Sequence, residues 1–287
     1  MQEFTVDQGS VGVRADKFVA AQYPQFTRSA LEALFDQSLV KVNDKTAKPA
    51  HKVKSGDRVI VDETLIKLDP PKIDLPIIYE DENVVVIDKP PGVLTHSKGA
   101  LNLEGTVASF VRPKVKELEG NRAGIVHRLD RATSGVIITA KNPQTLSKLQ
   151  KQFSNRKAKK VYLALVEGSL DPPEAIIDVP IARNPARPQT FKVSSSGKPA
   201  ITQYKVLKTF ADKDKTYSLV ELKPQTGRTH QLRLHMAYIG HPIAGDPIYG
   251  HSNDDRLMLH ASSLEITLPT SERKVFEAKL PKEFRDV

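Results

Sequence analysis

Residues 124–140 read Gly-Ile-Val-His-Arg-Leu-Asp-Arg-Ala-Thr-Ser-Gly-Val-Ile-Ile-Thr-Ala and place a charged cluster between two apolar runs with the character of strands. The cluster consists of His127, Arg128, Asp130 and Arg131. Burying a charge is costly unless the charge is paired. Asp130, the one acid in the cluster, is therefore either part of a structural ion pair or a working carboxylate. The stretch by itself leaves both interpretations open.

The composition is that of an intracellular globular protein. The 287 residues are 39% hydrophobic, which is enough to form a core in one large domain or two ordinary ones. There is no cysteine, which excludes disulfides and thiolate metal sites. The first residues lack the basic and apolar regions of a signal peptide, and the apolar runs are too short to span a bilayer. We therefore expect a cytoplasmic location.

The charge distribution favours a polyanionic partner. The formal net charge is +9, which is weak evidence by itself. Residues 41–58 hold six Lys or Arg against two Asp, and residues 148–160 hold six and no acid. Either cluster alone could be a solvated face. Two clusters in different parts of one chain favour a surface that contacts phosphates.

Residues 1–66 are expected to form a small unit. Asp16–Ala21 begins a helix, and Ser29 with Glu32 fits a capping box at the start of a second one. Two alternating segments, Leu39–Val42 and Arg58–Val61, are typical of strands. Two small helices and a basic strand pair bury little surface. We expect the exposed basic loops to carry the function of this unit.

Residues 67–76 are rich in proline and indicate a linker, after which residues 77–287 are expected to form one α+β domain. A helix is predicted after Asn142-Pro143, and another from about His230 to Ile239. The strand spacing is irregular and helices are few, so the pattern favours a mixed, mostly antiparallel sheet with flanking helices. The strand-like segments are Val84–Ile87, Val136–Thr139, Tyr162–Val166, Ala200–Leu207, Tyr217–Leu222 and Leu264–Leu268.

A second candidate site lies in Lys223–His235, where a strand ends and a helix begins. Arg228 and Arg233 are five residues apart and do not share a helical face, so we expect one to point inward and the other toward a ligand. His230 and His235 are poor metal ligands, because a helical zinc pair needs i,i+4 spacing and a further ligand. We expect no metal.

Two shorter features complete the set of candidates. Tyr162 opens a strand beside a basic helix end. It is either a core tyrosine with its hydroxyl at the rim or an aromatic platform for a base withdrawn from its stack. The turn Lys89-Pro90-Pro91-Gly92 follows a buried strand, and we expect it to be structural.

Two sets of segments resemble known families. The first is Arg14–Phe18, Thr27–Ser29, Val40–Asn43 and Val53–Asp57. These segments resemble the small RNA-binding domain of ribosomal small-subunit protein four, which implies that Arg28 and Lys41 bind structured RNA. The second set is, in chain order, Lys89–Gly92, His127–Gly135, Lys160–Tyr162, Gly227–Arg233 and Gly245–Gly250. With these motifs in the expected order, residues 77–270 resemble the RluA/RluD family of RNA pseudouridine synthases.

The synthase resemblance implies a role for each matching residue. Asp130 matches the catalytic aspartate that attacks the target uridine, and Arg233 matches the arginine that pairs with it. Tyr162 matches the aromatic residue that stacks on the flipped base and assists late proton removal. Arg128 matches the side chain that fills the gap in the RNA stack, and Arg228 is assigned to RNA binding. The reaction is an isomerisation, so no cofactor is expected.

The resemblance does not name the target uridines. Large-subunit ribosomal RNA is the default, and small-subunit or transfer RNA is also possible; a monomer is expected. One alternative is a non-catalytic RNA-binding or ribosome-assembly factor, which retention of Asp130, Tyr162 and Arg233 argues against. Another is a glycosidase or nuclease that uses Asp130. A glycosidase normally needs a second carboxylate, and no acidic partner motif is visible.

Overall fold

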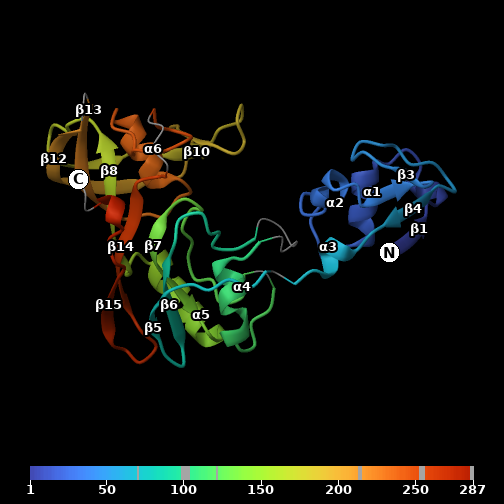
Figure 1. Ribbon diagram of the computed structural model, residues 1–287, viewed down its shortest axis with the longest axis horizontal. Helices are drawn as coiled ribbons and strands as arrows, with labels where there is room; N and C mark the ends of the chain where they lie inside the picture. Colours follow the sequence, from blue (N-terminus) through green and yellow to red (C-terminus); the bar gives the residue numbers. More distant parts are fainter. Residues whose placement is uncertain (70, 98–103, 121, 213–214, 252–255, 285–287) are drawn as a thin grey trace. The chain divides into compact units, whose positions relative to one another are not determined.

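The computed structural model describes residues 1–69, 71–97, 104–120, 122–212, 215–251 and 256–284, and it divides into two compact units (Figure 1). The first unit comprises Met1–Ile73, His96–Phe110 and Glu119–Arg122, and the second comprises Asp74–Thr95, Val111–Leu118 and Ala123–Val287. The boundaries expected at residues 66 and 77 stay a prediction. Within the described ranges no helix is long and apolar enough to cross a membrane.

The first unit contains a four-stranded antiparallel sheet in the order β1-β4-β2-β3. Its core is formed by apolar side chains from the strands and from α1 and α2, such as Phe18, Leu34 and Val59. The elements are β1 (Gln2–Thr5), a 3-10 turn (Gln8–Ser10), α1 (Ala15–Gln22), α2 (Glu32–Asp36), β2 (Val40–Val42), β3 (Lys45–Thr46), β4 (Arg58–Val61) and α3 (Thr64–Lys67).

One local prediction for this unit was wrong, and one strand was missed. The capping box at Ser29 does not form, because the residue before α2 is Leu31 and it provides no side-chain cap. Instead the Ala30 N–H donates to Thr27 Oγ1 at 3.2 Å. Strand β1 was not predicted, since its sequence, Gln-Glu-Phe-Thr, is mostly polar and exposed. Pairing with the buried strand β4 holds it in place.

The second unit is built on a nine-stranded sheet in the order β5-β6-β7-β14-β8-β13-β12-β9, with β15 paired to β14. A separate two-stranded ribbon joins β10 to β11. A short helix, α4 (Val107–Val111), ends at the boundary between the two units. The other elements are β5 (Ile77–Glu80), β6 (Val84–Lys89), β7 (Ser134–Ala140), α5 (Pro143–Ser154), β8 (Lys159–Glu167), β9 (Glu174–Asp178), β10 (Ile181–Arg183), β11 (Phe191–Val193), β12 (Ile201–Asp212), β13 (Lys215–Pro224), α6 (Gln231–Tyr238), β14 (Leu259–Thr267) and β15 (Arg273–Glu277), with 3-10 turns at Arg112–Lys114 and Lys282–Phe284.

The predicted α+β class with a mixed, mostly antiparallel sheet is confirmed. Among the described strands only β7 and β14 pair in parallel, with His260 opposite Ser134 and Ala261 opposite Gly135. Gly135 has φ +110°, and a Cβ there would collide with the carbonyl of Ala261. Glycine therefore lets the two strands approach closely. This junction fixes the start of β7, directly after the charged cluster that contains Asp130.

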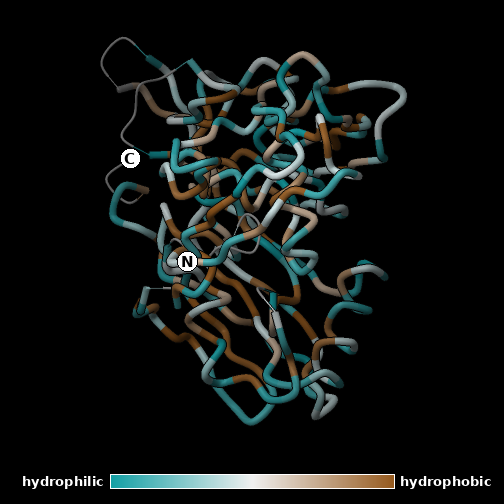
Figure 2. Tube along the Cα trace, turned by 90° about the vertical axis from the view of Figure 1, so that its right-hand side faces the viewer, coloured by the Kyte–Doolittle hydropathy of each residue, from teal (hydrophilic) through white to brown (hydrophobic). Residues whose placement is uncertain are grey.

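Helix α5 begins as predicted, because the Asn142 side chain accepts a hydrogen bond from the Thr145 N–H at 2.9 Å and Pro143 occupies the first turn. Its Leu149 is fully buried in a core shared with β6, β7, β14 and β15. A second core joins α6 to β8 and β13. Hydrophobic residues follow the strands of both cores, whereas the peripheral loops are largely hydrophilic (Figure 2).

Candidate active site

Asp130 lies in a loop whose backbone is fixed by side chains. The hydroxyl of Thr95 donates to the Leu129 carbonyl at 2.8 Å and accepts from the Leu129 N–H at 3.1 Å, so it holds both polar groups of the preceding residue. The Thr133 N–H donates to the Asp130 carbonyl at 3.1 Å, which closes a tight turn after it. The Asp130 side chain is 18% exposed. Its carboxylate is thus accessible from a rigid backbone.

Lys89, at the end of β6, secures the other side of this loop. Its fully buried Nζ donates to the carbonyls of Pro90, Val93 and Arg131 at 2.9, 2.8 and 3.1 Å. Burial lowers the pKa of Lys89 to about 7, while the nearby Asp130 carboxylate opposes that shift. The three carbonyls use all three donors of an ammonium group. The turn that begins at Lys89 is therefore structural, as expected, and it supports the loop that carries Asp130.

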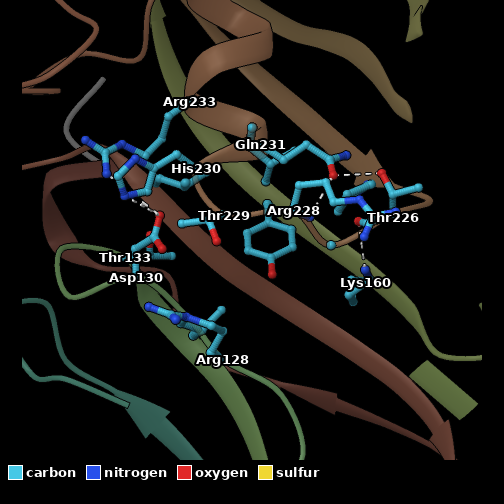
Figure 3. Close-up of a pocket in the computed structure, with 16 residues that line it drawn as sticks. Arg128, Asp130, Thr133, Lys160, Thr226, Arg228, Thr229, His230, Gln231 and Arg233 are labelled. Atoms are coloured by element: carbon cyan, nitrogen blue, oxygen red, sulfur yellow. Dashed lines mark hydrogen bonds and ion pairs between the residues drawn. The ribbon is translucent and has the colours of Figure 1, made fainter. Parts of the chain in front are cut away.

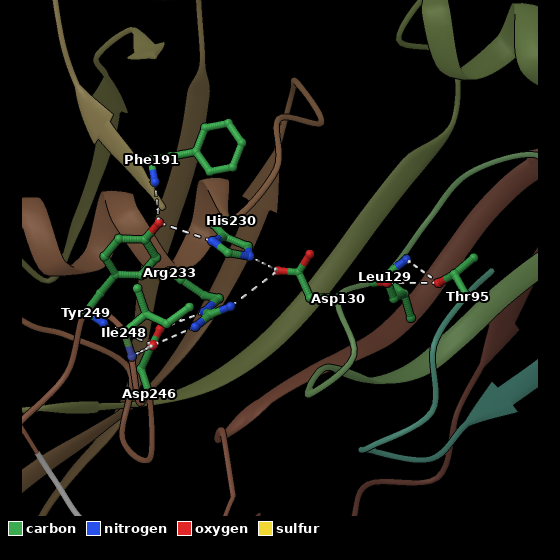
Figure 4. A network of polar contacts seen from close by, with 9 residues as sticks. All are labelled: Thr95, Leu129, Asp130, Phe191, His230, Arg233, Asp246, Ile248 and Tyr249. Atoms are coloured by element: carbon green, nitrogen blue, oxygen red, sulfur yellow. Dashed lines mark hydrogen bonds and ion pairs between the residues drawn. The ribbon is translucent and has the colours of Figure 1, made fainter. Parts of the chain in front are cut away.

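Arg233, in the first turn of α6, points into the protein and is 4% exposed. Its Nε and Nη2 donate to Asp246 Oδ2 and Oδ1 at 2.7 and 2.6 Å, whereas its Nη1 lies 3.7 Å from Asp130 Oδ2 (Figure 4). The N–H groups of Ile248 and Tyr249 also donate to Asp246 Oδ1. The expected pairing of Arg233 with Asp130 is present as a longer contact, and the sequence reasoning missed Asp246 as the main partner.

The Arg233–Asp246 pair is ionised. Burial by itself would raise the pKa of the Asp246 carboxyl, but the hydrogen bonds and charge of Arg233 outweigh it and hold that pKa below its usual value. Burial would likewise lower the pKa of Arg233, and the two carboxylates outweigh it. Bidentate pairing fixes the plane of the guanidinium. Asp246 therefore orients Arg233 and leaves Nη1 free to face Asp130.

His230 is a second neighbour of Asp130 that sequence reasoning did not assign to the site. Its Nε2 lies 3.9 Å from Asp130 Oδ2, and its Nδ1 is hydrogen-bonded to the Tyr249 hydroxyl at 3.1 Å. That hydroxyl also accepts from the Phe191 N–H at 2.9 Å. Burial lowers the pKa of His230, against the influence of Asp130. The backbone of His230 has φ +56°, a conformation that is strained for any residue other than glycine. Residues with such strain cluster at functional sites.

Asp130, His230 and Arg233 line a pocket of about 100 Å³, which lies entirely within the second unit. Asp130 faces Arg233 and His230 at one end, and Lys160 lies at the other (Figure 3). Tyr162, on β8, forms part of the wall, and burial raises its pKa, so its phenol is neutral. The pocket therefore places Asp130, Tyr162 and Arg233 around one small space.

The two other arginines predicted for this region, Arg128 and Arg228, also line the pocket and are exposed. The Nε of Arg228 donates to the Pro199 carbonyl at 3.1 Å. Gln231, which sequence reasoning did not single out, holds the turn before α6: its Oε1 accepts from the Arg228 N–H and from the Thr226 hydroxyl. The spacing predicted that one of the two arginines points inward and the other toward a ligand. In the structure Arg233 is the buried one, and Arg228 is exposed at the pocket.

Arg28 and Lys41 lie in the first unit. Arg28 is exposed, and its Nε is 3.9 Å from Asp16 Oδ2. The same carboxylate accepts hydrogen bonds from Arg14 at 2.8 and 3.1 Å. Lys41 is the exposed residue of β2, between two buried valines. Both predicted RNA-binding residues therefore have accessible cationic ends.

Two histidines outside the Asp130 centre, His127 and His235, have structural surroundings. His127 is stacked on Phe153 with ring centroids 4.4 Å apart, and its Nε2 accepts from the Ile138 N–H. Burial lowers its pKa to about 3, so the ring is neutral. The Nε2 of His235 is 3.2 Å from the Val179 carbonyl. In the part of the chain that the structure describes, no group of three or more histidine and acidic side chains could hold a metal.

The model of the RNA pseudouridylate synthase family matches residues 83–238, and an S4 domain model matches residues 13–59. This chain belongs to the RNA pseudouridylate synthase family. The resemblances expected from the sequence are thereby confirmed, and so is the expected class of enzyme. The S4 match lies within the first unit, and Asp130, Tyr162 and Arg233 lie within the synthase match.

Relatives match nearly the whole length of the synthase. The ribosomal large subunit pseudouridine synthase D of Borreliella burgdorferi is 38% identical over 99% of this chain and 90% of its own length. The protein of the same name from Nitrosomonas europaea is 37% identical over 97% of this chain and 84% of its own length. The solved structure of human RNA pseudouridylate synthase domain containing 1 is 30% identical, with a TM-score of 0.62, and covers 75% of this chain and 87% of that one.

Proposed function

We propose that this synthase converts particular uridines of large-subunit ribosomal RNA to pseudouridine, and that Asp130, Arg233 and Tyr162 carry the chemistry. The observation on which the proposal rests is the shared pocket, in which an accessible carboxylate faces a fixed guanidinium beside a neutral tyrosine. The RNA class is that named for the Borreliella burgdorferi and Nitrosomonas europaea relatives. The S4 domain provides a second surface for structured RNA.

In the proposed reaction the Asp130 carboxylate attacks the target uridine, and the bond between the base and its sugar breaks. The base rotates and rejoins the sugar through carbon five, while the bond between Asp130 and the nucleotide breaks and the carboxylate is restored. Carbon five then loses its proton, and the base nitrogen that left the sugar takes up a proton. Atoms and electrons balance within the nucleotide, so the reaction needs no external oxidant or reductant. An ionised carboxylate suits this nucleophilic role. The Arg233 Nη1, 3.7 Å from Asp130 Oδ2, stabilises its charge and sets its direction.

The base must leave the RNA stack before Asp130 can reach it, which costs a few kcal/mol. We propose that Tyr162 stacks on the withdrawn base and that the exposed guanidinium of Arg128 fills the gap in the RNA. The Tyr162 hydroxyl would assist in removing the proton from carbon five. Because burial raises the pKa of Tyr162, its phenol is neutral before reaction, which favours stacking as its first role.

The remaining parts of the proposal concern the setting of the enzyme. Arg28 and Lys41 of the S4 domain bind phosphates of structured RNA, and Arg228 does so at the rim of the pocket. The chain acts as a monomer in the cytoplasm. The alternative of an RNA-binding factor without catalysis is disfavoured, because Asp130, Tyr162 and Arg233 line one pocket and bulk RNA binding does not need that arrangement.

The proposal is tested by incubating the purified full chain with unmodified transcripts of large-subunit ribosomal RNA, small-subunit ribosomal RNA and transfer RNA, and mapping pseudouridine in each. New pseudouridine at discrete positions of the large-subunit transcript is expected. Modification confined to one of the other two RNAs would refute the assignment of large-subunit ribosomal RNA as substrate. It would still agree with pseudouridine synthase activity. RNA that binds and stays unmodified in all three would favour the non-catalytic alternative.

A further inference from the structure

A second, larger pocket adjoins the one that contains Asp130. It has a volume of about 370 Å³ and lies within the second unit. Its walls include Arg128, Lys160, Tyr162 and Arg228, all of which also line the Asp130 pocket. A nucleotide held in one pocket would therefore place its neighbour along the RNA strand at the mouth of the other.

The larger pocket is strongly cationic. Four of its lining side chains are basic: Arg128, Arg156, Lys160 and Arg228. None of its lining residues, which all belong to the described part of the chain, is acidic. Lys160 donates to the Thr226 carbonyl at 3.3 Å, and burial lowers its pKa to about 8, which leaves it mostly charged at neutral pH. Such a pocket favours an anion.

The floor of this pocket is rigid and uncharged. His127 and Phe153 stack there at an interplanar angle of 20°, and the neutral imidazole adds no competing charge. Phe153 belongs to the last turn of α5, so the floor is tied to the end of that helix. The cationic ends are thus held around a fixed surface.

Arg156 occupies a backbone position that normally belongs to glycine. The Lys157 N–H donates to the Gln152 carbonyl at 2.8 Å, and the Arg156 N–H donates to that of Phe153 at 3.2 Å. These two bonds form a Schellman motif at the end of α5, in which Arg156 is the left-handed residue with φ +57°. An L-residue with a large side chain is strained there. A cation at a helix C-terminus gains a small stabilisation from the helix dipole, but glycine would adopt this conformation without strain, so an arginine here points to a use for its side chain.

We infer that this pocket binds a backbone phosphate of the RNA strand next to the flipped uridine, and that Arg156 is one of its ligands. The inference rests on the proposed function and extends it by a phosphate subsite. Arg156 and Arg128 are exposed, and neither side chain has a hydrogen bond or ion pair to another described residue. Their guanidinium groups are therefore available for a phosphate, which they match in geometry.

The substitution Arg156→Gly separates this role from a structural one. Glycine suits the left-handed position, so the variant should melt at the same temperature as the wild type or higher. Removing one phosphate contact should weaken RNA binding about tenfold. The slope of log Kd against log salt should decrease by about 0.7–0.9. Arg156→Asn provides a second variant, because asparagine also tolerates the left-handed backbone conformation. Lys151→Ala is the control, because it removes an exposed charge of α5 that does not line the pocket.

The decisive experiment uses the full chain and a fluorescein-labelled RNA stem-loop with one loop uridine. Loop phosphates are replaced one at a time by neutral methylphosphonates, and Kd is measured by anisotropy. For the wild type, replacing one particular phosphate beside the uridine should weaken binding about tenfold. For Arg156→Gly, replacing the same phosphate should not weaken binding any further. Lys151→Ala should retain the wild-type profile.

Three results would overturn the inference: wild-type affinity in both Arg156 variants, an equal loss in Lys151→Ala, or no coupling between Arg156 and any phosphate beside the uridine. Tritium release from the same stem-loop, labelled at carbon five of the uridine, is measured in parallel. Coupled binding without release would leave the phosphate subsite standing, and the mapping of pseudouridine in the three transcripts would then decide the proposed function. Release without coupling would contradict the subsite alone.

Discussion

The Asp130 centre and the cationic rim beside it are built in opposite ways. In the centre, Arg233 and Asp246 have at least two short polar contacts each, and the loop around Asp130 is held by Thr95 and Lys89. On the rim, by contrast, the exposed arginines at 128 and 156 have side chains without such partners among the described residues. Reacting groups must be oriented before substrate arrives, whereas phosphate ligands must stay available. Substitutions in the centre should therefore reduce kcat, and those on the rim should weaken RNA binding.

Among the residues that support Asp130, the largest effect is expected for Asp246→Asn. This change removes the charge that pairs with the buried guanidinium of Arg233, which should cost about 3–5 kcal/mol of stability. The freed Arg233 no longer faces Asp130 at a fixed angle, so kcat should fall about 100-fold with little change in KM. Tritium release and chemical denaturation measure the two effects. Asp178→Asn, at an exposed position, is the control. A loss of RNA affinity with normal kcat in Asp246→Asn would contradict the assignment of catalysis to the centre and of RNA binding to the rim.

Lys89→Met is expected to have the next largest effect. Methionine fills a similar volume but leaves the carbonyls of Pro90, Val93 and Arg131 without the Nζ donor. The loop around Asp130 should loosen, and kcat should fall about tenfold. Single-turnover kinetics at saturating RNA measure the change. The control is Lys282→Met, which changes an exposed lysine in the same unit and should behave as the wild type. Full activity in Lys89→Met would show that Lys89 is not needed to hold the Asp130 loop.

The sequence was most informative where function depends on a recognisable local motif. It predicted Asp130, Tyr162 and Arg233, and the structure brings these three residues into one pocket. It missed the Arg233–Asp246 pair, because the partners are 13 residues apart on different segments and no local pattern joins them. The contact between Thr95 and Leu129, across 34 residues, is hidden for the same reason.

The fold shows a similar division. Each of the six strand segments predicted for the second unit overlaps an observed strand, and only Ala200 and Leu268 lie one residue outside. Each segment is long enough to show an apolar pattern. Strand β1 and the ribbon formed by β10 and β11 were not predicted. These strands are only three or four residues long and depend on partners elsewhere in the chain. Their own sequences show no clear strand pattern, and hydrogen-bonded pairing with distant segments stabilises them as strands.

A smaller effect is expected for the double substitution Arg28→Ala and Lys41→Ala in the S4 domain. Both side chains are exposed, so folding should be unaffected. Loss of two cations should weaken binding to ribosomal RNA about tenfold at moderate salt and flatten its salt dependence. Chemistry on bound RNA should proceed at the wild-type rate. Filter binding and single-turnover release measure the two quantities, and a reduced rate at saturation would show that the S4 domain also affects the chemistry.

The last effect is on stability and not on activity or binding, and it is a pH dependence that arises from buried His260. Burial lowers its folded-state pKa to about 4, whereas the unfolded value is about 6.5. Between these values the unfolded chain binds more protons, so acidification from pH 6.5 to 4 should reduce the free energy of unfolding by up to about 1.4 kcal/mol per pH unit. Denaturation across this window should show a shallower slope for His260→Gln. The exposed His51→Gln control should leave the slope unchanged.

The account depends most directly on the Asp130 carboxylate. Asp130→Asn keeps the size of the side chain and should leave the neighbouring pair of Arg233 and Asp246 in place. Tritium release is measured from ribosomal RNA labelled at carbon five of uridine, with RNA affinity measured in parallel. The account predicts no detectable release by Asp130→Asn and an affinity close to that of the wild type. Release at the wild-type rate from Asp130→Asn would contradict it.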